Sequence, residues 1–477
     1  MMLFYVYLSY RICGVSITTE SSEVQVKTFR KRCLIQNILT IVMFAICSVS
    51  VMHNVGNHKI FSIICFEIIY MIITLVLYRI IYPRCSRLIL NNMIMLLSIG
   101  FLMSFRLAID NAFKQFVIVV IATSISFIIP NLMKCKRFIV GSRYVFAIIG
   151  IILLGVTLVM GKTSFGANLS FEIAGIAFQP SEFIKLIYVL FLAGILSRHE
   201  EFRYVVISAV FAAIHVVILI LSNDLGTGLI FFVVYVIMLF IATGKLRYPV
   251  AGFMAGGIAA VLAYRYVGHV RTRVIAWLDP WKYIDDKGYQ ITQSLFAIGM
   301  GGLFGMGFFE GLPTKIPVVA KDFVFAAIAE EFGLIYAICI ILICFSSFIG
   351  IMRVAIRIND KFYKLVASGM GALYIFQCFL TFGGVTKFIP STGVTLPFVS
   401  YGGSSVLCSI IMFAIVQTVF ITDSSSQGVK RGRNNEKEQA KKQSKGQFKK
   451  QSKEQNKEQT KSNGQGRSGA TGNIKSR

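Results

Sequence analysis

The chain has 477 residues, of which 56% are hydrophobic and only 15% are charged. A soluble protein of this length has too little interior to bury so much apolar surface, and many apolar runs here are long enough to cross a bilayer. The composition therefore excludes an ordinary soluble protein and predicts an all-α, polytopic membrane protein. The formal net charge of +26 is unevenly placed, because the last 55 or so residues carry about 15 Lys or Arg against about 5 Asp or Glu.

Apolar runs of about 18 residues predict twelve transmembrane helices. In chain order they lie near 34–52, 60–78, 88–105, 115–132, 144–161, 182–197, 204–221, 225–243, 248–264, 323–350, 364–382 and 403–421. They divide the chain into an N-terminal segment (1–33), N-terminal membrane helices (34–143), a membrane core (144–421) and a tail (422–477). The tail is basic, polar and nearly free of large apolar side chains, so we predict a disordered cytoplasmic extension.

The distribution of basic residues predicts the orientation of the spans. With the N-terminus inside, the inner loops collect clusters of cations at 27–32, 84–87, 134–143 and 353–364, whereas most short outer loops carry only one or two. The positive-inside rule therefore places both termini in the cytoplasm, with the N-terminal segment 1–33 on that side.

The outer loop 265–322 is the exception, because it carries several cations on the outer side. A loop of this length has little influence on topology, so it does not overturn the orientation. Its middle, 290–309, is apolar and rich in glycine, which predicts a helix or a re-entrant element in the outer leaflet. The loop is interpreted either as part of a basic, partly embedded cavity suited to an anionic lipid headgroup, or as a solvated loop with incidental charge.

Ten cysteines are scattered along the chain without a Cys-x-x-Cys pair, and most lie within apolar runs. This pattern is typical of small buried hydrophobic side chains, so we predict neither a disulfide framework nor a metal site. The basic tail could contact anionic lipid, but we expect no nucleic acid partner.

Ionisable side chains at the ends of spans are candidates for function, because charge is costly there. Glu182 and Lys185 are three residues apart on a helix opened by Pro180, a spacing that places them on one face. They form either a structural ion pair or part of a site. Asp322 immediately precedes the span 323–350, where it either caps the helix or serves as a carboxylate at the boundary between water and bilayer.

Glu330 and Glu331 lie two turns deeper in the same span. Adjacent residues on a helix point about 100° apart, so these carboxylates cannot form a shared pair side by side. We expect at least one of them to face a polar interior or to be protonated.

The segment 388–405 is the most specified stretch of backbone in the chain. It contains two prolines, three glycines and a cluster of hydroxyl groups, and an apolar span follows it. Proline fixes the backbone and glycine permits shapes closed to other residues, so the pattern predicts a built surface or a re-entrant element that lines a cavity.

Four blocks in fixed order resemble the signature of the SEDS family (shape, elongation, division and sporulation), whose members include FtsW, RodA and SpoVE. They are Phe-Gln-Pro-Ser-Glu-Phe-Ile-Lys at 178–185, Asp-Leu-Gly-Thr at 224–227, the stretch from Arg273 to Gly333, and the proline-rich block at 388–405. Together they cover roughly residues 160–421. The family core has ten membrane helices, so the resemblance implies two extra spans at the N-terminus.

The resemblance implies a peptidoglycan glycosyltransferase that polymerises lipid II on the outer face of the bacterial cytoplasmic membrane. It also implies a class B penicillin-binding protein as partner, together with other proteins of the division or elongation machinery. Asp322 matches the proposed catalytic carboxylate and would act as general base, while cations would stabilise the departing pyrophosphate. No nucleotide or other cofactor is implied, although a divalent ion on the pyrophosphate is compatible with this chemistry. The residues expected to bind substrate or support the site are Glu182, Lys185, Arg271, Arg273, Gln293, Glu330, Glu331, Ser391, Thr392, Ser400 and Tyr401.

The chain departs from the family pattern at several positions. Leu169 and Ser170 stand where an Arg and a Trp are usual, Ser222-Asn223 replaces Gln-Pro, and Thr381 replaces an Asn. These departures keep two alternatives open: a flippase or transporter of a lipid-linked precursor, and a weakly active scaffold for a penicillin-binding protein. The sequence does not distinguish elongation, division and sporulation roles.

Overall fold

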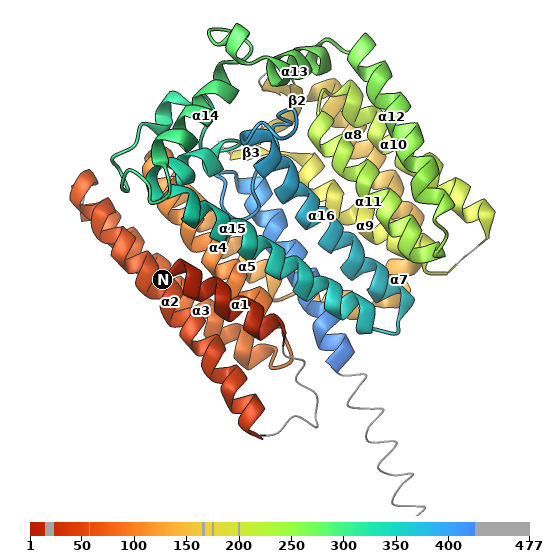
Figure 1. Cartoon of the computed structure of the whole chain (residues 1–477). Helices are drawn as coiled ribbons and strands as arrows, with labels where there is room; N and C mark the ends of the chain where they lie inside the picture. Colours follow the sequence, from red (N-terminus) through yellow and green to blue (C-terminus); the bar gives the residue numbers. More distant parts are fainter. Residues whose placement is uncertain (15–22, 57, 165–166, 174–175, 199–200, 425–477) are drawn as a thin grey trace, which may run out of the picture. The chain divides into compact units, whose positions relative to one another are not determined.

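The computed structural model describes residues 1–14, 23–56, 58–164, 167–173, 176–198 and 201–424, and these residues are almost entirely helical (Figure 1). The helices are α1 (Met2–Cys13), α2 (Glu23–Val55), α3 (His58–Ile81), α4 (Arg87–Leu107), α5 (Ile109–Ser126), α6 (Ile129–Lys134), α7 (Lys136–Gly141), α8 (Arg143–Met160), α9 (Pro180–Leu196), α10 (Phe202–Leu221), α11 (Leu225–Thr243), α12 (Arg247–Tyr266), α13 (Gly268–Leu278), α14 (Tyr289–Gly301), α15 (Val324–Arg357) and α16 (Lys361–Val385), followed by a last helix, Gly403–Ser424. Most of the predicted tail, 425–477, lies outside the described residues.

Eleven of the twelve predicted spans coincide with one helix each, and the span 115–132 covers parts of α5 and α6, which together form one candidate span. Ten helices of the described chain are at least 18 residues long and apolar enough to cross a membrane. The other two are α9, which has 17 residues, and α12, which meets α13 at an angle of 97°. The prediction of an all-α polytopic fold is therefore confirmed, while the cytoplasmic placement of the termini remains a prediction from charge.

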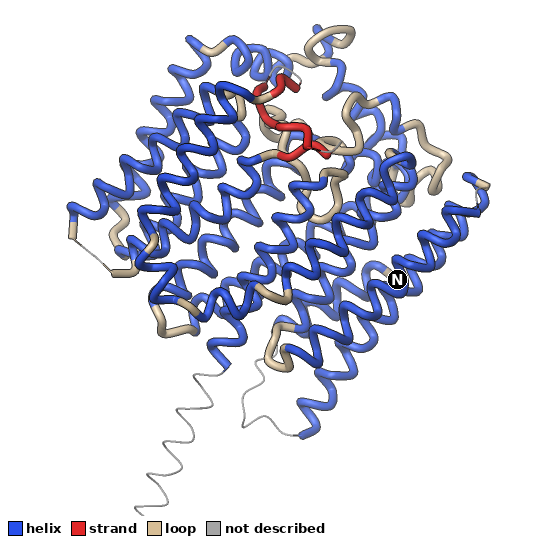
Figure 2. Tube along the Cα trace, turned by 180° about the vertical axis from the view of Figure 1, so that it is seen from behind, coloured by secondary structure: helices blue, strands red, loops and turns tan. Residues whose placement is uncertain are grey.

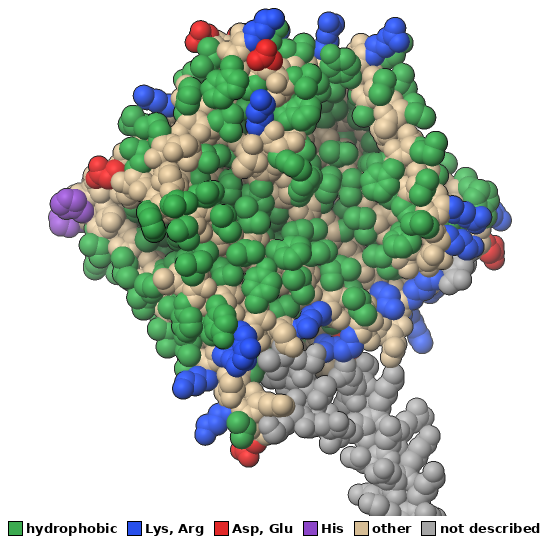
Figure 3. Space-filling model, viewed as in Figure 1, with side chains coloured by type: hydrophobic (Ala, Val, Ile, Leu, Met, Phe, Trp, Pro, Cys, Tyr) green, Lys and Arg blue, Asp and Glu red, His purple; other side chains and the backbone are tan. Residues whose placement is uncertain are grey.

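The molecular surface agrees with a membrane environment. Hydrophobic side chains cover the middle of the face in Figure 3, and Lys and Arg gather near its upper and lower edges. The extreme case is α12, whose residues are all at least partly exposed although the helix is largely apolar. Such surfaces are stable when lipid, rather than water, surrounds them.

A small antiparallel sheet, which the sequence analysis did not predict, joins α8 to α9 (Figure 2). Its strands are β1 (Lys162–Ser164), β2 (Ala167–Ile173) and β3 (Ile176–Phe178), in the order β1-β2-β3. The strands are too short to show a clear two-residue alternation between long apolar spans. Leu169 and Ser170, the departures from the family pattern, lie in β2.

The N-terminal segment contains a helix that the sequence analysis did not predict, because residues 2–13 form a helix that packs against α2, α4 and α15. A buried polar network holds α1 in place. Asn92 accepts hydrogen bonds from Tyr5 Oη (3.1 Å) and Ser9 Oγ (3.2 Å), and its own amide donates to Ser346 and Ser347 on α15. Buried polar groups in an apolar bundle need such partners, so the network fixes how α1, α4 and α15 pack.

Candidate active site

A cavity of about 520 Å³ opens where several helix ends converge. Its walls come from the N-termini of α9 and α11, from α5, α13 and α14, from the residues just before α15, and from segment 391–405. Seven charged side chains line it: the carboxylates of Glu182, Asp224 and Asp322, and the cations of Lys114, Arg273, Lys287 and Lys321. This concentration of charge at the end of apolar helices makes the cavity the candidate active site.

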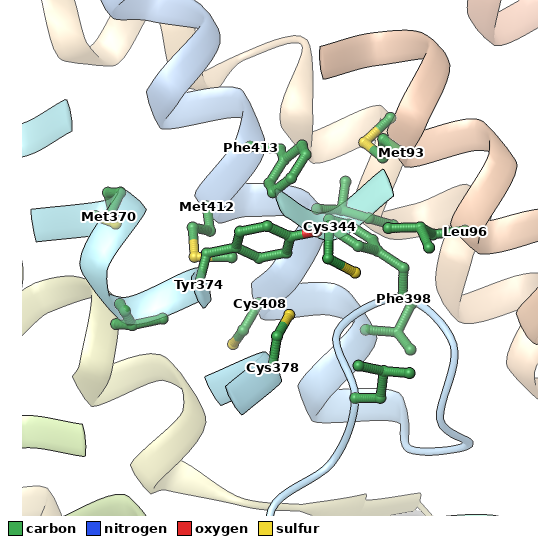
Figure 4. Packing of buried hydrophobic residues seen from close by; sticks show 14 of the residues in the cluster. Met93, Leu96, Cys344, Met370, Tyr374, Cys378, Phe398, Cys408, Met412 and Phe413 are labelled. Carbon is green, nitrogen blue, oxygen red and sulfur yellow. The ribbon is translucent and has the colours of Figure 1, made fainter. Parts of the chain in front are cut away.

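The proline-rich segment forms one wall of the cavity, as its sequence predicted. Phe398 is buried against Tyr374 on α16 and against Phe413 on the last helix, with ring centroids 6.4 and 4.6 Å apart (Figure 4). Gly100 on α4 admits this segment, because a Cβ there would lie 2.4 Å from the Phe398 carbonyl oxygen. Phe398 itself has a φ of +67°, a strained backbone that the surrounding aromatic packing stabilises.

Asp322 lies in the cavity wall immediately before α15. The helix begins at Val324, and its N-cap, Phe323, makes no side-chain hydrogen bond to the first turn. Asp322 precedes this N-cap by one residue and therefore does not occupy the capping position. The interpretation of Asp322 as a helix cap is excluded. Its carboxyl group is only partly accessible and lines the cavity.

The surroundings of Asp322 change its acidity. Burial raises the pKa of its carboxyl group from 3.8 to about 6, and the nearby charge of Asp224 adds to the rise. Lys321 and Arg273 oppose this effect, because cations favour the ionised carboxylate. A carboxyl group with a pKa close to neutral pH is suited to accept a proton.

Arg273 approaches the same point from α13. Its Nη1 donates to the Ser391 carbonyl oxygen (3.2 Å), which ties the guanidinium to the proline-rich segment. Between Arg273 and Asp322 lies Gly393, with a φ of +71°; a Cβ there would sit 3.5 Å from Asp322 Oδ2 and 3.8 Å from Arg273 Nη2. Glycine thus brings the backbone of the segment close to both charged groups.

Glu182 and Lys185 form a buried ion pair on the first turns of α9. Lys185 Nζ donates to Glu182 Oε1 (2.9 Å) and to Gln377 Oε1 (3.2 Å), and Gln377 in turn donates to the Thr395 carbonyl oxygen (3.0 Å). Glu182 lines the cavity, whereas Lys185 lies behind it. The cations that lower the pKa of Asp322 are therefore Lys321 and Arg273, not Lys185, which instead links α9 to the proline-rich segment through Gln377.

Asp224, the first residue of the Asp-Leu-Gly-Thr block, is a cavity residue that was not predicted as a site residue. It does cap α11, since Thr227 N donates to Oδ1 (3.2 Å), but Oδ2 also accepts from Ser181 Oγ (3.2 Å) and the carboxyl group lines the cavity. Burial is the main cause that raises its pKa, and the hydrogen bonds to Thr227 partly offset the rise. Both Asp224 and Asp322 interact electrostatically with the Arg273 guanidinium.

The structure brings together some of the remaining predicted residues and separates others. Ser391, Thr392 and Tyr401 line the cavity. Ser400 lies beneath it, where its hydroxyl donates to the Lys321 carbonyl oxygen and accepts from Leu396 N (2.9 Å). Arg271 and Gln293 are not among the residues that line the cavity.

Glu330 and Glu331 lie outside the cavity and hold the outer loop onto α15. Arg106, at the end of α4, donates from Nε to Glu331 Oε1 (2.6 Å) and from Nη2 to the Gly311 carbonyl oxygen (2.8 Å). Glu330 Oε1 accepts from Leu312 N (2.8 Å). The polar contacts of these carboxylates therefore come from Arg106 and from the outer-loop backbone at Leu312, and their geometry indicates a structural role rather than a transport path.

Three cavity cations were not predicted as site residues: Lys114, Lys287 and Lys321. Lys321 was adjacent to the proposed carboxylate, which is a usable signal, whereas Lys114 belongs to α5 and reaches the cavity only through the fold. Within the described residues, no group of three or more His, Cys, Asp or Glu side chains could hold a metal ion.

Comparisons with known proteins identify the family. The model of the FtsW/RodA/SpoVE family of cell cycle proteins matches residues 84–424. The peptidoglycan glycosyltransferase RodA of Mycobacterium leprae (strain TN) is 29% identical over 363 residues, which cover 71% of this chain and 78% of that protein. The probable peptidoglycan glycosyltransferase FtsW of Aliivibrio salmonicida (strain LFI1238) is 32% identical over 343 residues, which cover 69% of this chain and 85% of that protein.

A solved structure shares the fold. A chain from a structure described as "Structural coordination of polymerization and crosslinking by a peptidoglycan synthase complex" gives a TM-score of 0.62 at 22% identity, and covers 71% of this chain and 98% of that chain. This protein belongs to the FtsW/RodA/SpoVE family. Helices α1–α3 precede the matched region, as expected for two extra spans added to the N-terminus of a ten-helix core.

Proposed function

We propose that this protein is a peptidoglycan glycosyltransferase that polymerises lipid II, with Asp322 as the general base. The observation that carries the proposal is the convergence of Asp322 and Arg273 in one charged cavity at the end of apolar helices. Family membership and the relatives' activity as peptidoglycan glycosyltransferases support it. If both termini are cytoplasmic, the cavity opens on the outer face of the membrane.

The proposed reaction joins two lipid-linked sugars. A hydroxyl oxygen of the acceptor sugar attacks the anomeric carbon of the donor, the bond from that carbon to the pyrophosphate oxygen breaks, and Asp322 accepts the hydroxyl proton. Arg273 and the cavity lysines, Lys287 and Lys321, stabilise the negative charge of the departing polyprenyl pyrophosphate. The donor is already activated, so the reaction needs no nucleotide, and a divalent ion would enter only with the pyrophosphate of the substrate.

Glu182 and Lys185 are assigned a supporting role in this scheme. Their buried ion pair, extended through Gln377 to the Thr395 carbonyl oxygen, holds α9 against the proline-rich segment. Ser391 supports the site in the same way, because its carbonyl oxygen accepts from Arg273. These contacts orient the guanidinium and the wall of the cavity before substrate binds, which lowers the cost of organising charge during reaction.

We further propose that the protein acts in the bacterial cytoplasmic membrane together with a class B penicillin-binding protein. Polymerisation alone gives uncrosslinked strands, so a transpeptidase beside the polymerase would crosslink its product. The structural neighbour from a peptidoglycan synthase complex that couples polymerisation to crosslinking supports this arrangement. Other partners would belong to the division or elongation machinery.

The test is glycan synthesis from lipid II by the purified protein, with its candidate class B partner present. Wild type, Asp322→Ala and Asp285→Ala are compared on a gel that resolves polymer length. Asp285 is an exposed carboxylate of the same outer loop that does not line the cavity, so it controls for a general loss of negative charge. We expect a ladder from wild type and Asp285→Ala, and about 10²–10⁴-fold slower synthesis by Asp322→Ala.

The other outcomes separate the alternatives. Equal ladders from wild type and Asp322→Ala would show that the base has been wrongly assigned. If a well-folded wild type that binds its partner made no polymer, the protein would instead be a scaffold or a lipid flippase. Movement of fluorescent lipid II between the leaflets of proteoliposomes would then distinguish these two.

A further inference from the structure

A second, smaller cavity lies at the opposite end of the helices that build the candidate active site. It encloses about 390 Å³, and its walls come from α7, from the end of α9 and from the start of α16. The chain direction places it, because Glu182 in the first turn of α9 lines the large cavity and Ser197, directly after the end of α9, lines the small one. Under the predicted orientation, this cavity faces the cytoplasm.

The charge of this cavity is strongly unbalanced. Four cations line it, Lys136, Arg137, Arg198 and Lys361, but the only carboxylate among its described lining residues is Asp360. That carboxylate is already engaged: Oδ1 accepts from Phe362 N (3.0 Å) and Tyr363 N (3.3 Å) at the start of α16, and Oδ2 accepts from Lys136 Nζ. Arg137 and Arg198 therefore add two guanidinium charges to the cavity, and its described lining supplies no second carboxylate to offset them.

The surroundings of the cavity also suit a ligand that is partly apolar. Val140 and Phe362 line it but are buried, at 2% and 1% exposure, so the apolar surface open to a ligand lies beside the cavity. The short helices next to it, α6 and α7, expose Leu132 (58%) and Phe138 (70%). Large apolar side chains exposed next to a basic cluster at the end of membrane helices are typical of a position at the headgroup level of a bilayer.

We propose that this basic pocket binds the phosphate group of an anionic phospholipid in the cytoplasmic leaflet. Arg137 and Arg198 contact the phosphate oxygens, since a guanidinium can donate two parallel hydrogen bonds to such a group. Leu132 and Phe138, which are exposed on the neighbouring helices, contact the apolar part of the lipid. The Lys136–Asp360 ion pair acts as a structural clamp between α7 and α16 rather than as a ligand.

The test counts lipids retained by the full-length protein in detergent, by native mass spectrometry, with phosphatidylglycerol and phosphatidylcholine as probes. The site variant is Arg137→Ala/Arg198→Ala. The matched control is Arg30→Ala/Lys31→Ala, which removes two exposed cations of α2 from the same predicted face but outside the cavity. Thermal unfolding of all three proteins establishes that they are equally folded.

We expect the wild type and the control to prefer phosphatidylglycerol over phosphatidylcholine, and the site variant to lose about thirtyfold in affinity for phosphatidylglycerol. The estimate follows from a contribution of about fivefold for each basic residue near an anionic headgroup. Equal retention of phosphatidylglycerol by the site variant and the wild type would overturn the proposal, as would equal losses in the two variants.

A second arm distinguishes a lipid from a soluble ligand. Inorganic phosphate is titrated against the lipid-free protein and against the complex with phosphatidylglycerol. Weak binding that fails to displace the lipid supports a phospholipid as the ligand. Binding of inorganic phosphate as tight as that of the lipid, and lost in the site variant, would overturn the lipid assignment in favour of a soluble phosphate.

Discussion

Replacing Asp322 by asparagine should stabilise the protein at neutral pH while it removes activity. Burial raises the pKa of this carboxyl group from 3.8 to about 6 in the folded chain. An acid whose pKa is higher in the folded state costs stability when it is ionised, because the unfolded chain ionises it more readily. The full cost is present above about pH 6 and disappears as the pH falls from 6 towards 3.8.

The size of the effect follows from the shift. A rise of about two units corresponds to an upper limit of roughly 3 kcal/mol, at 1.36 kcal/mol per unit. The carboxyl group is partly accessible, so solvent screens part of this cost, and we expect a gain of about 1–2 kcal/mol for Asp322→Asn. The amide is nearly isosteric with the carboxylate, so no cavity is created.

Thermal unfolding in detergent checks this prediction. Wild type, Asp322→Asn and the control Asp285→Asn are melted at about pH 7.5 and about pH 4.5, which lie on either side of the proposed folded pKa. The midpoint of Asp322→Asn should exceed that of wild type at the higher pH, and the difference should shrink at the lower pH. A lower midpoint for Asp322→Asn at the higher pH would refute the reasoning, because it would mean that the ionised carboxylate stabilises the fold.

Three further predictions concern the same region. The rate of glycan synthesis should rise with pH through about 6 as Asp322 ionises. Lys321→Gln should move the midpoint of this rise to higher pH by roughly half a pH unit, because it removes a cation that favours the carboxylate. A pH–rate profile with an unchanged midpoint would contradict this prediction. Arg106→Met should lower the free energy of unfolding by about 3–5 kcal/mol, because it removes the ion-pair partner of the buried Glu331. In a double-mutant cycle, the double variant Arg106→Met/Glu331→Met should recover most of this loss. Gly393→Ala should lower the free energy of unfolding by about 1–2 kcal/mol, because alanine disfavours a φ of +71°. The rate of polymerisation should also fall. Activity and melting temperature equal to those of wild type would show that the backbone adjusts to alanine without cost.

Much of the fold could be predicted from hydropathy, because a segment that crosses the lipid bilayer must be both long and apolar. Each apolar run of suitable length became a helix, and this held even where α12 and α13 bend by 97° at their junction. Hydropathy missed the elements that are shorter than a span. Helix α1 has only 12 residues, although its buried side chains recur at helical spacing and it contacts Asn92 through hydrogen bonds. The strands β1–β3 pair over only a few residues, which leaves no clear alternation in the sequence.

The residues of the candidate active site likewise fall into some that the sequence predicted and others that only the fold brings together. The ordered motifs located Asp322 and Arg273 and the proline-rich wall, because these residues are close to element ends that must converge. The sequence could not distinguish Arg271 from Arg273 as the cavity residue. Helix residues that are two positions apart point about 200° apart, so only one of them faces the cavity. Similarly, Gln290 lines the cavity while Gln293 does not. Lys114 carried no signal at all, because only tertiary packing brings α5 to the site.

Helix α4 connects these observations physically. Its membrane span is buried within the bundle, and it contacts the proline-rich wall and the outer loop: Gly100 admits the Phe398 carbonyl, and Arg106 holds Glu331 and the Gly311 carbonyl. Its other face carries Asn92, which the family-external helix α1 engages. Packed cores transmit displacement because they contain few voids. Helix α1 therefore braces the helix against which the proline-rich wall and the outer loop are both set, and it contributes no residue to the described lining of the cavity.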